Sequence, residues 1–277
     1  MQIKVSDNIG FCFGVKHAVE LSEEALSKKN GKIYSMGPII HNPQVVKELS
    51  DKGLTPVEDI DGIKEGTVVV SSHGAGAKLK KKKGIKLIDA TCPFVKKIQE
   101  RVDRLYKDGY SVIIIGKKAH PEVKALTDFT DGRAIVVKDA GEARELELNG
   151  SKVGIVSQST YSQDTFLEIV SILLNMPFSE IRVFNTICRD TIKRQGSVRI
   201  LARDVDMMIV VGGKNSSNTR RLVEVCKDEN RDVYHIENEE EIDRSWFSGK
   251  ESVGIASGTS TPGWVVQDII DQIGRYN

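Results

Sequence analysis

The stretch QIKVSDNIGFC, residues 2–12, is a short strand-like run that ends on a cysteine. The same pattern returns as GIKLIDATC at 84–92 and as EIRVFNTIC at 180–188. A helix-like run follows each cysteine. Cys92 lies 80 residues after Cys12, and Cys188 lies 96 residues after Cys92. Three copies of one pattern at such intervals indicate an internal repeat.

Two further sets of segments repeat with the same period. In the first, a glycine after an apolar run is followed four positions later by a polar residue: Gly37 and His41, Gly116 and His120, Gly212 and Ser216. In the second, small polar residues follow the apolar runs of VVVSSHG (68–74), GIVSQST (154–160) and GIASGTS (254–260). His73, Ser159 and Thr259 fall at matching places in these segments.

Amphipathic helical patterns lie between the strand-like runs, so the sequence predicts an α/β fold built from βαβ units with parallel sheets. The first two repeats end in a strand that leads to a cysteine, whereas the third ends in a helix. We therefore expect the N-terminal strand to complete the third sheet. The predicted domains are 13–92, 93–188, and 189–277 completed by 1–12, closed into a ring with a cysteine at each junction.

Composition fits a soluble globular protein. The chain has 277 residues, 39% hydrophobic and 29% charged, with a formal net charge of +1. This balance gives no electrostatic case for nucleic acid or membrane binding. The start of the chain lacks a signal-peptide pattern, and no apolar run is long enough to span a bilayer, so we expect a cytoplasmic protein.

The cysteines at the three junctions indicate a metal site. Disulfides are not expected in a reducing compartment, and thiolates bind zinc or iron–sulfur clusters. Zinc sites usually contain a close-spaced ligand pair, which is missing here, so a cluster is favoured over zinc and over three unrelated buried thiols. Cys226 differs because it falls on the apolar stripe of a helix, and it is expected in the core.

The repeated loops also collect polar side chains at the carboxyl ends of strands, where α/β sheets bind ligands. They are His41, His73, His120, Ser159, Thr160, Ser216, Ser217, Asn218 and Ser260. Such donors suit an anion, most simply a phosphate or diphosphate. Glu122 in the same loops is either an ordinary first-turn glutamate or an acid whose pKa is raised beside an anionic ligand.

Seven short motifs, taken in order, resemble the 4-hydroxy-3-methylbut-2-enyl diphosphate reductase family of the non-mevalonate isoprenoid pathway. They are GFCFGV (10–15), HN (41–42), SSHG (71–74), DATCP (89–93), HPEV (120–123), KNSSNT (214–219) and SGTSTP (257–262). Each motif alone is weak, but the series covers essentially the whole chain.

The resemblance implies a trefoil of three α/β domains around a [4Fe-4S] cluster held by Cys12, Cys92 and Cys188. One iron would have an open position for the substrate hydroxyl, and its loss would give a [3Fe-4S] form. The implied substrate ligands are His41, His73, His120, Ser216, Asn218 and Ser260, with Ser217 close by. Glu122 is the implied proton source, and a ferredoxin or flavodoxin type protein is the implied electron donor. We expect the protein itself to be a monomer.

Two departures from the family pattern bear on the site. Ser159-Thr160 stands where the family usually has Thr-Thr, which leaves open which hydroxyl orients Glu122. Phe13 stands where alanine often follows the first cysteine.

A binding or sensor protein that holds a metal without turnover is the alternative function. The basic run KLKKKKGIK (78–86) is expected to be a solvated helix face, with a docking patch for an acidic electron donor as the alternative.

Overall fold

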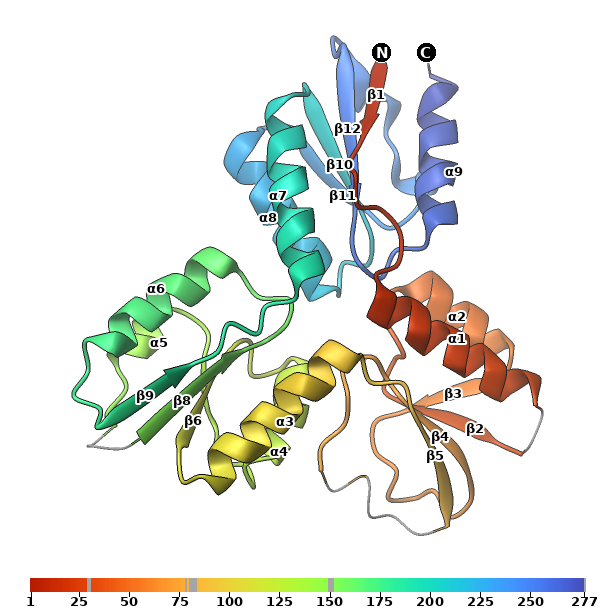
Figure 1. Ribbon diagram of the computed structural model, residues 1–277. Coiled ribbons are helices and arrows are strands. Elements are labelled where there is room, and N and C mark those ends of the chain that lie inside the picture. Colours follow the sequence, from red (N-terminus) through yellow and green to blue (C-terminus); the bar gives the residue numbers. More distant parts are fainter. Residues whose placement is uncertain (29–30, 78, 80–83, 149–151, 277) are drawn as a thin grey trace. The chain divides into compact units, whose positions relative to one another are not determined.

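The computed structural model describes residues 1–28, 31–77, 79, 84–148 and 152–276 (Figure 1). Most of the basic run at 78–86 therefore lies outside the described residues. The described chain forms two compact units. Unit 1 comprises Met1–Lys16, Ile40–Lys47 and Arg189–Asn277, and unit 2 comprises His17–Ile39 and Glu48–Cys188.

Unit 1 contains one parallel sheet of four strands. Their order is β1 (Gln2–Val5), β12 (Ser252–Ser257), β10 (Met207–Val211) and β11 (Val233–Ile236). The expectation that the N-terminal strand completes the last sheet is confirmed, because Gln2 pairs with Ser252 and Val5 with Ile255. Three helices accompany the sheet: α7 (Arg189–Arg203), α8 (Ser217–Glu229) and α9 (Gly263–Gly274).

The unit 1 sheet is buried on both faces, as its nearly continuous apolar strands require. Met207, Ile209 and Val211 of β10 pack with α9 on one face. Met208 and Val210 pack with α7 and α8 on the other. This alternation follows from the two-residue period of a strand. Cys226 belongs to the second face and is fully buried, so its expected place in the core is confirmed.

Unit 2 contains two parallel sheets with the same topology as each other. The first has the order β3 (Leu54–Val57), β2 (Ile33–Met36), β4 (Gly66–Val70) and β5 (Ile85–Asp89). The second has the order β7 (Ile135–Val137), β6 (Ser111–Ile115), β8 (Lys152–Ser157) and β9 (Glu180–Val183). The helices that belong wholly or partly to this unit are α1 (Phe13–Ser27), α2 (Pro43–Asp51), α3 (Pro93–Lys107), α4 (Pro121–Asp128), α5 (Ala140–Arg144) and α6 (Gln163–Leu174).

The three sheets share one strand order, which confirms the α/β class and the threefold repeat. In each, the first strand along the repeat lies between the second and the third, and the fourth forms the edge. The strand β1 takes the fourth place in the unit 1 sheet. The boundaries of the three predicted domains remain a prediction. In the described part of the chain, no helix has both the length and the apolar character needed to cross a membrane.

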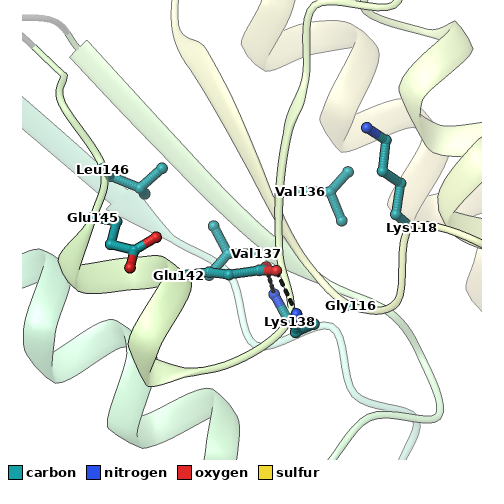
Figure 2. A pocket seen from close by; sticks show the side chains of 8 residues that line it. All are labelled: Gly116, Lys118, Val136, Val137, Lys138, Glu142, Glu145 and Leu146. Carbon is teal, nitrogen blue, oxygen red and sulfur yellow. Dashed lines mark hydrogen bonds and ion pairs between the residues drawn. The ribbon is translucent and has the colours of Figure 1, made fainter.

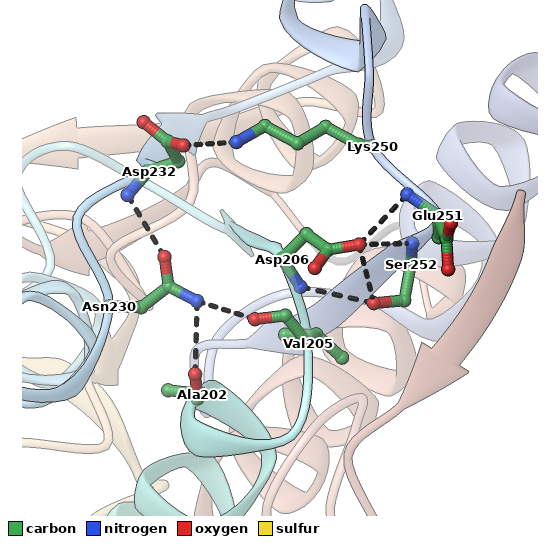
Figure 3. A network of polar contacts seen from close by, with 8 residues as sticks. All are labelled: Ala202, Val205, Asp206, Asn230, Asp232, Lys250, Glu251 and Ser252. Carbon is green, nitrogen blue, oxygen red and sulfur yellow. Dashed lines mark hydrogen bonds and ion pairs between the residues drawn. The ribbon is translucent and has the colours of Figure 1, made fainter.

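A polar network closes the amino-terminal edge of the unit 1 sheet (Figure 3). The Asp206 carboxylate accepts hydrogen bonds from the backbone N–H groups of Glu251 and Ser252, both at 2.8 Å. The Asn230 amide donates to the carbonyl oxygens of Ala202 (3.0 Å) and Val205 (2.8 Å). Because these groups tie helix ends to strand starts, they stabilise the edge remote from the polar loops.

Candidate active site

The three junction cysteines occupy equivalent backbone positions. Each lies immediately before a helix, since α1 begins at Phe13, α3 at Pro93 and α7 at Arg189. Each backbone N–H also donates to a carbonyl oxygen in a loop that follows a strand. The pairs are Cys12 with Thr259 (3.0 Å), Cys92 with Ser72 (3.1 Å) and Cys188 with Ser159 (2.8 Å). The same two constraints therefore hold all three thiols.

The strand registers revise one correspondence predicted from the sequence. Val70, Ser157 and Ser257 occupy the same place in their sheets, paired with Met36, Ile115 and Val211. The residue three positions after each of these is His73, Thr160 or Ser260. The predicted match of His73 with Ser159 and Thr259 is therefore wrong by one residue. Ser72, and not His73, is the equivalent of Ser159 and Thr259. The cysteine hydrogen bonds agree, because their acceptors are the carbonyl oxygens of these three residues.

The Cys92 thiol is half-buried at the start of α3. Burial raises the pKa of Cys92, while the backbone N–H groups of Phe94 and Val95 favour its thiolate. Charges on Cys188 and Glu122 raise this pKa further. The three ionisable groups are thus electrostatic neighbours within unit 2. A bound cation would favour the thiolates, because a metal ligand must be deprotonated.

Glu122 is buried in the first turn of α4, with 1% of its surface exposed. Ser159 holds its carboxyl group through two hydrogen bonds, from the backbone N–H at 2.7 Å and from the hydroxyl at 2.6 Å. Burial raises the pKa of Glu122 to about 7, and the two bonds from Ser159 oppose this rise. The raised value agrees with the expected acid, although burial rather than an adjacent anion causes it.

Ser159, and not Thr160, is the hydroxyl that contacts Glu122. The Thr160 hydroxyl accepts a hydrogen bond from the Gln158 side-chain amide at 2.8 Å. Gln158 is fully buried, and its side-chain oxygen Oε1 accepts a hydrogen bond from the Lys117 N–H at 3.1 Å. Gln158 therefore braces the loops after β6 and β8. Sequence reasoning missed it, although its place between Ser157 and Ser159 in a repeated loop was a signal.

His120 caps the amino terminus of α4. Its Nδ1 accepts a hydrogen bond from the Glu122 N–H at 3.2 Å, so in the neutral ring the proton is on Nε2. The His73 ring meets the His120 ring edge-on, with 5.5 Å between centroids. Unit 2 thus brings together two imidazoles, the buried Glu122 carboxyl and its Ser159 partner.

Unit 1 brings together the remaining predicted ligands. Ser216 caps α8, and its hydroxyl accepts from the Thr219 N–H at 3.3 Å. Ser217 and Asn218 follow in the first turn and are buried. The Ser260 hydroxyl donates to the His41 carbonyl oxygen at 3.0 Å. The segment that carries His41 therefore belongs to this unit, although its neighbours in sequence belong to unit 2.

Asn218 has the features of a side chain built for a ligand. It is 2% exposed, yet neither its amide nitrogen nor its carbonyl oxygen has a hydrogen-bond partner among the described residues. Such a buried polar group is costly unless a ligand satisfies it. It lies at the start of α8, where backbone N–H groups and the helix dipole favour an anion.

Two glycines let the His41 segment and the loop after β12 approach the start of α8. A Cβ at Gly213 would lie 2.5 Å from the His41 carbonyl oxygen, and one at Gly258 would lie 2.0 Å from the Thr219 hydroxyl. Burial lowers the pKa of His41, and the charge of Arg220 lowers it further. A bound anion would oppose both effects and favour the cationic imidazole.

A pocket of about 370 Å³ lies elsewhere in unit 2, beside the ends of β6 and β7 (Figure 2). An ion pair between Lys138 and Glu142, at 2.7 Å, lies within it. The described residues that line it include none of the predicted site residues. Gly116 and Lys118, which belong to the loop after β6, do line it, so the pocket borders that loop without including a predicted site residue.

Comparisons with known proteins agree over nearly the whole chain. The sequence model of the LytB protein family matches residues 3–274. A protein of Geobacter sulfurreducens named 4-hydroxy-3-methylbut-2-enyl diphosphate reductase is 45% identical over 280 residues, which cover 100% of this chain and 98% of that protein. A protein of Aquifex aeolicus with the same name is 44% identical, covering 99% of this chain and 96% of that protein.

Solved structures of proteins described as the same reductase share the fold. The structure from Plasmodium falciparum aligns with a TM-score of 0.92 at 29% identity, covering 98% of this chain and 87% of that chain. A second, described as the terminal enzyme of the non-mevalonate pathway, aligns with a TM-score of 0.69 at 44% identity, covering 99% of this chain and 100% of that chain. These matches confirm the resemblance drawn from the seven motifs. On this evidence, the chain belongs to the LytB protein family.

Proposed function

We propose that this chain removes the hydroxyl group of 4-hydroxy-3-methylbut-2-enyl diphosphate reductively. One substrate, two electrons and two protons give one water and one isopentenyl or dimethylallyl diphosphate. The observation that carries the proposal is the arrangement around Ser159. Its hydroxyl and N–H hold Glu122, while its carbonyl oxygen receives the Cys188 N–H at 2.8 Å. One residue thus connects a proton donor with a thiol suited to a metal cluster.

We propose Cys12, Cys92 and Cys188 as the ligands of a single [4Fe-4S] cluster, which can lose its fourth iron to give a [3Fe-4S] form. The residues fit such a group, because all three cysteines are half-buried and lie at helix starts. Each also donates an equivalent backbone hydrogen bond to the loop after a strand. A helix start favours the thiolate. When bound, the cluster would supply electrons and, at an iron without a protein ligand, a Lewis acid.

We propose that the diphosphate is held by side chains of the repeated polar loops, namely His41, His73, His120, Ser216, Ser217, Asn218 and Ser260. The buried Asn218 amide without a partner among the described residues is the strongest support for an anion at α8. His120 would donate from Nε2, since its Nδ1 already accepts from the backbone. Ser159 and Thr160 complete the set, with Ser159 acting mainly on Glu122.

Glu122 would supply the proton with which the hydroxyl leaves as water. A pKa of about 7 leaves a large fraction of the carboxyl protonated at neutral pH, as a general acid requires. The two hydrogen bonds from Ser159 fix the carboxyl plane. We expect the alkaline limb of the activity profile to report the loss of this proton.

The electron donor would be a ferredoxin or flavodoxin type protein in the cytoplasm, and the enzyme itself a monomer. The alternative of a metal-containing sensor without turnover is not favoured, because the full-length relatives named above are called reductases.

Anaerobically purified protein tests the proposal. It should contain iron and sulfide, show the EPR signal of an iron–sulfur cluster, and consume the hydroxylated diphosphate when a reductant is supplied. E122Q should still bind substrate but lose most of its rate. Iron-free protein that is active with zinc would contradict the proposal, and an E122Q variant with unchanged turnover would contradict the role of Glu122.

A further inference from the structure

Arg194 of α7 is a buried arginine that the proposed chemistry does not use. Its side chain is 3% exposed, and its one charged partner among the described residues is Asp190, at 2.8 Å from Nε. The rest of the guanidinium group donates to backbone carbonyl oxygens. Nη1 reaches Asn8 (2.8 Å) and Ser257 (3.2 Å), and Nη2 reaches Gly10 (2.9 Å).

Two of these carbonyl groups belong to the segment that leads from β1 to Cys12. The segment is also tied to the end of β12, since the Gly10 N–H donates to the Ser257 hydroxyl at 3.1 Å. Gly10 has a φ of +78°, a left-handed conformation that favours glycine. Arg194 therefore clamps a tight turn two residues before the cysteine, and the same fork binds the strand end behind it.

The other two cysteine junctions do not need such a clamp. Two residues separate β5 from Cys92, and Thr91 binds Asp89 through its N–H (3.1 Å) and hydroxyl (2.5 Å). Four residues separate β9 from Cys188, and the Thr186 hydroxyl bridges the N–H and carbonyl of Ser157. Each junction is thus held by a threonine of its own.

The junction at Cys12 is the longest of the three, with six residues between β1 and the cysteine. It receives its restraint from α7, through Arg194 and through a hydrogen bond of 2.8 Å between Ser197 and Ser6. The planar fork of arginine can serve several carbonyl groups at fixed angles, whereas the ammonium group of lysine is a point charge. We therefore expect substitution of Arg194 by lysine to weaken the hold on the turn before Cys12.

We propose that Arg194 is a positioning residue for Cys12, which it holds in the conformation needed to bind the cluster. The inference rests on the proposed function, because it takes Cys12 as a cluster ligand. Arg194 acts through the Asn8–Gly10 turn and does not itself touch substrate. Without the clamp, Cys12 should therefore bind the proposed cluster less firmly, while Cys92 and Cys188 keep their geometry.

Selective labelling of cysteines in the cluster-loaded protein tests this. Wild type, R194Q, R194K and R203Q are treated anaerobically with a ferrous chelator and an alkylating agent, and the labelling rate of each cysteine is followed by mass spectrometry. R203Q is the matched control, because Arg203 lies on the same helix and pairs with Glu229 at 2.7 Å, away from the turn. EPR spectra of the same samples report the cluster.

In R194Q we expect Cys12 to label at least about tenfold faster than in wild type, with Cys92 and Cys188 nearly unchanged and an altered EPR signal. R194K should show a smaller rise at the same cysteine, and R203Q should match wild type. If R194Q does not fold, R194K gives the same comparison. Equal acceleration at all three cysteines, or none at Cys12, would overturn the inference.

A C12S variant separates this inference from the proposed function. If C12S keeps full iron content and the wild-type EPR signal, Cys12 is not a ligand, and the proposed ligand set fails together with the inference. If C12S loses the cluster while R194Q and R194K label like wild type, the ligand set stands and the role of Arg194 is refuted.

Discussion

Glutamine in place of Glu122 removes a carboxyl group whose pKa is raised by burial. The pKa of Glu122 rises from 4.5 to about 7 on folding, with burial as the main cause. This difference is roughly 2.5 pH units, which at about 1.36 kcal/mol each corresponds to roughly 3 kcal/mol. Glu122 is 1% exposed, so solvent does little to reduce this energy.

The sign follows from proton binding. Well below pH 4.5, the folded and unfolded states both hold the proton, and the group imposes no penalty. As the pH rises, the unfolded state loses its proton first, so the folded state holds more protons and its stability falls. Above a pH of about 7 both states are ionised, and the full penalty remains.

Urea unfolding followed by tryptophan fluorescence measures the effect. Wild type and E122Q are compared in the same cluster state from about pH 4 to about pH 8.5. The free energy of unfolding of E122Q minus that of wild type should rise by roughly 3 kcal/mol across this range, because the other titrating groups cancel. T160A is the control, since Thr160 contacts Gln158 and its difference from wild type should not vary with pH. A difference for E122Q that stays constant within about 0.5 kcal/mol would refute the reasoning.

The remaining predictions concern single hydrogen-bonding groups. S159A loses one charge-assisted hydrogen bond, so the alkaline limb of its activity profile should move up by about one to two pH units, which T160A should not do. N218A should raise KM about 10- to 100-fold with a smaller change in kcat, measured by steady-state kinetics. N230A leaves the Ala202 and Val205 carbonyl groups without its amide and should lower the free energy of unfolding by about 1–3 kcal/mol, with kcat unchanged.

Each of these has an outcome that would contradict it. An S159A profile that overlays wild type would mean that the Ser159 hydroxyl does not bind the ionised carboxyl. A wild-type KM in N218A would remove the amide from the binding site. Lower kcat in N230A would show that the edge network affects the chemistry as well as the stability.

Much of the fold could be predicted because the chain repeats one pattern three times. A strand or helix identified in one repeat is therefore expected at the matching place in the other two. The return of a strand, a cysteine and a helix predicted three sheets and a missing strand, and β1 supplies that strand. In the short polar loops, no apolar period fixes which residues of the three repeats correspond. The predicted position of His73 in the repeat was therefore wrong by one residue, as the strand pairing with Met36 and Ile115 and the cysteine hydrogen bonds reveal.

The site was partly predictable for a related reason. The polar residues of the proposed site recur in the repeated loops, so Glu122 and Ser159 could be named from the sequence. The cause of the raised pKa could not, because burial depends on packing between segments far apart. Arg194 gave no signal, since a single arginine within a helix is normally solvent-exposed. Its role appears only when Asn8 and Gly10 are seen to lie beside α7.

The pairing of β1 with β12 also has a consequence for biosynthesis. Residue 2 pairs with residue 252, so β1 must wait for about 250 further residues to be synthesised before its partner strand exists. Until then β1 lacks its partner strand, and Cys12, the proposed cluster ligand that follows β1, takes its place only after Cys92 and Cys188 have been made. With the proposed ligand set, the cluster would be complete only after β12 has been made, so its assembly would follow the synthesis of all three sheets.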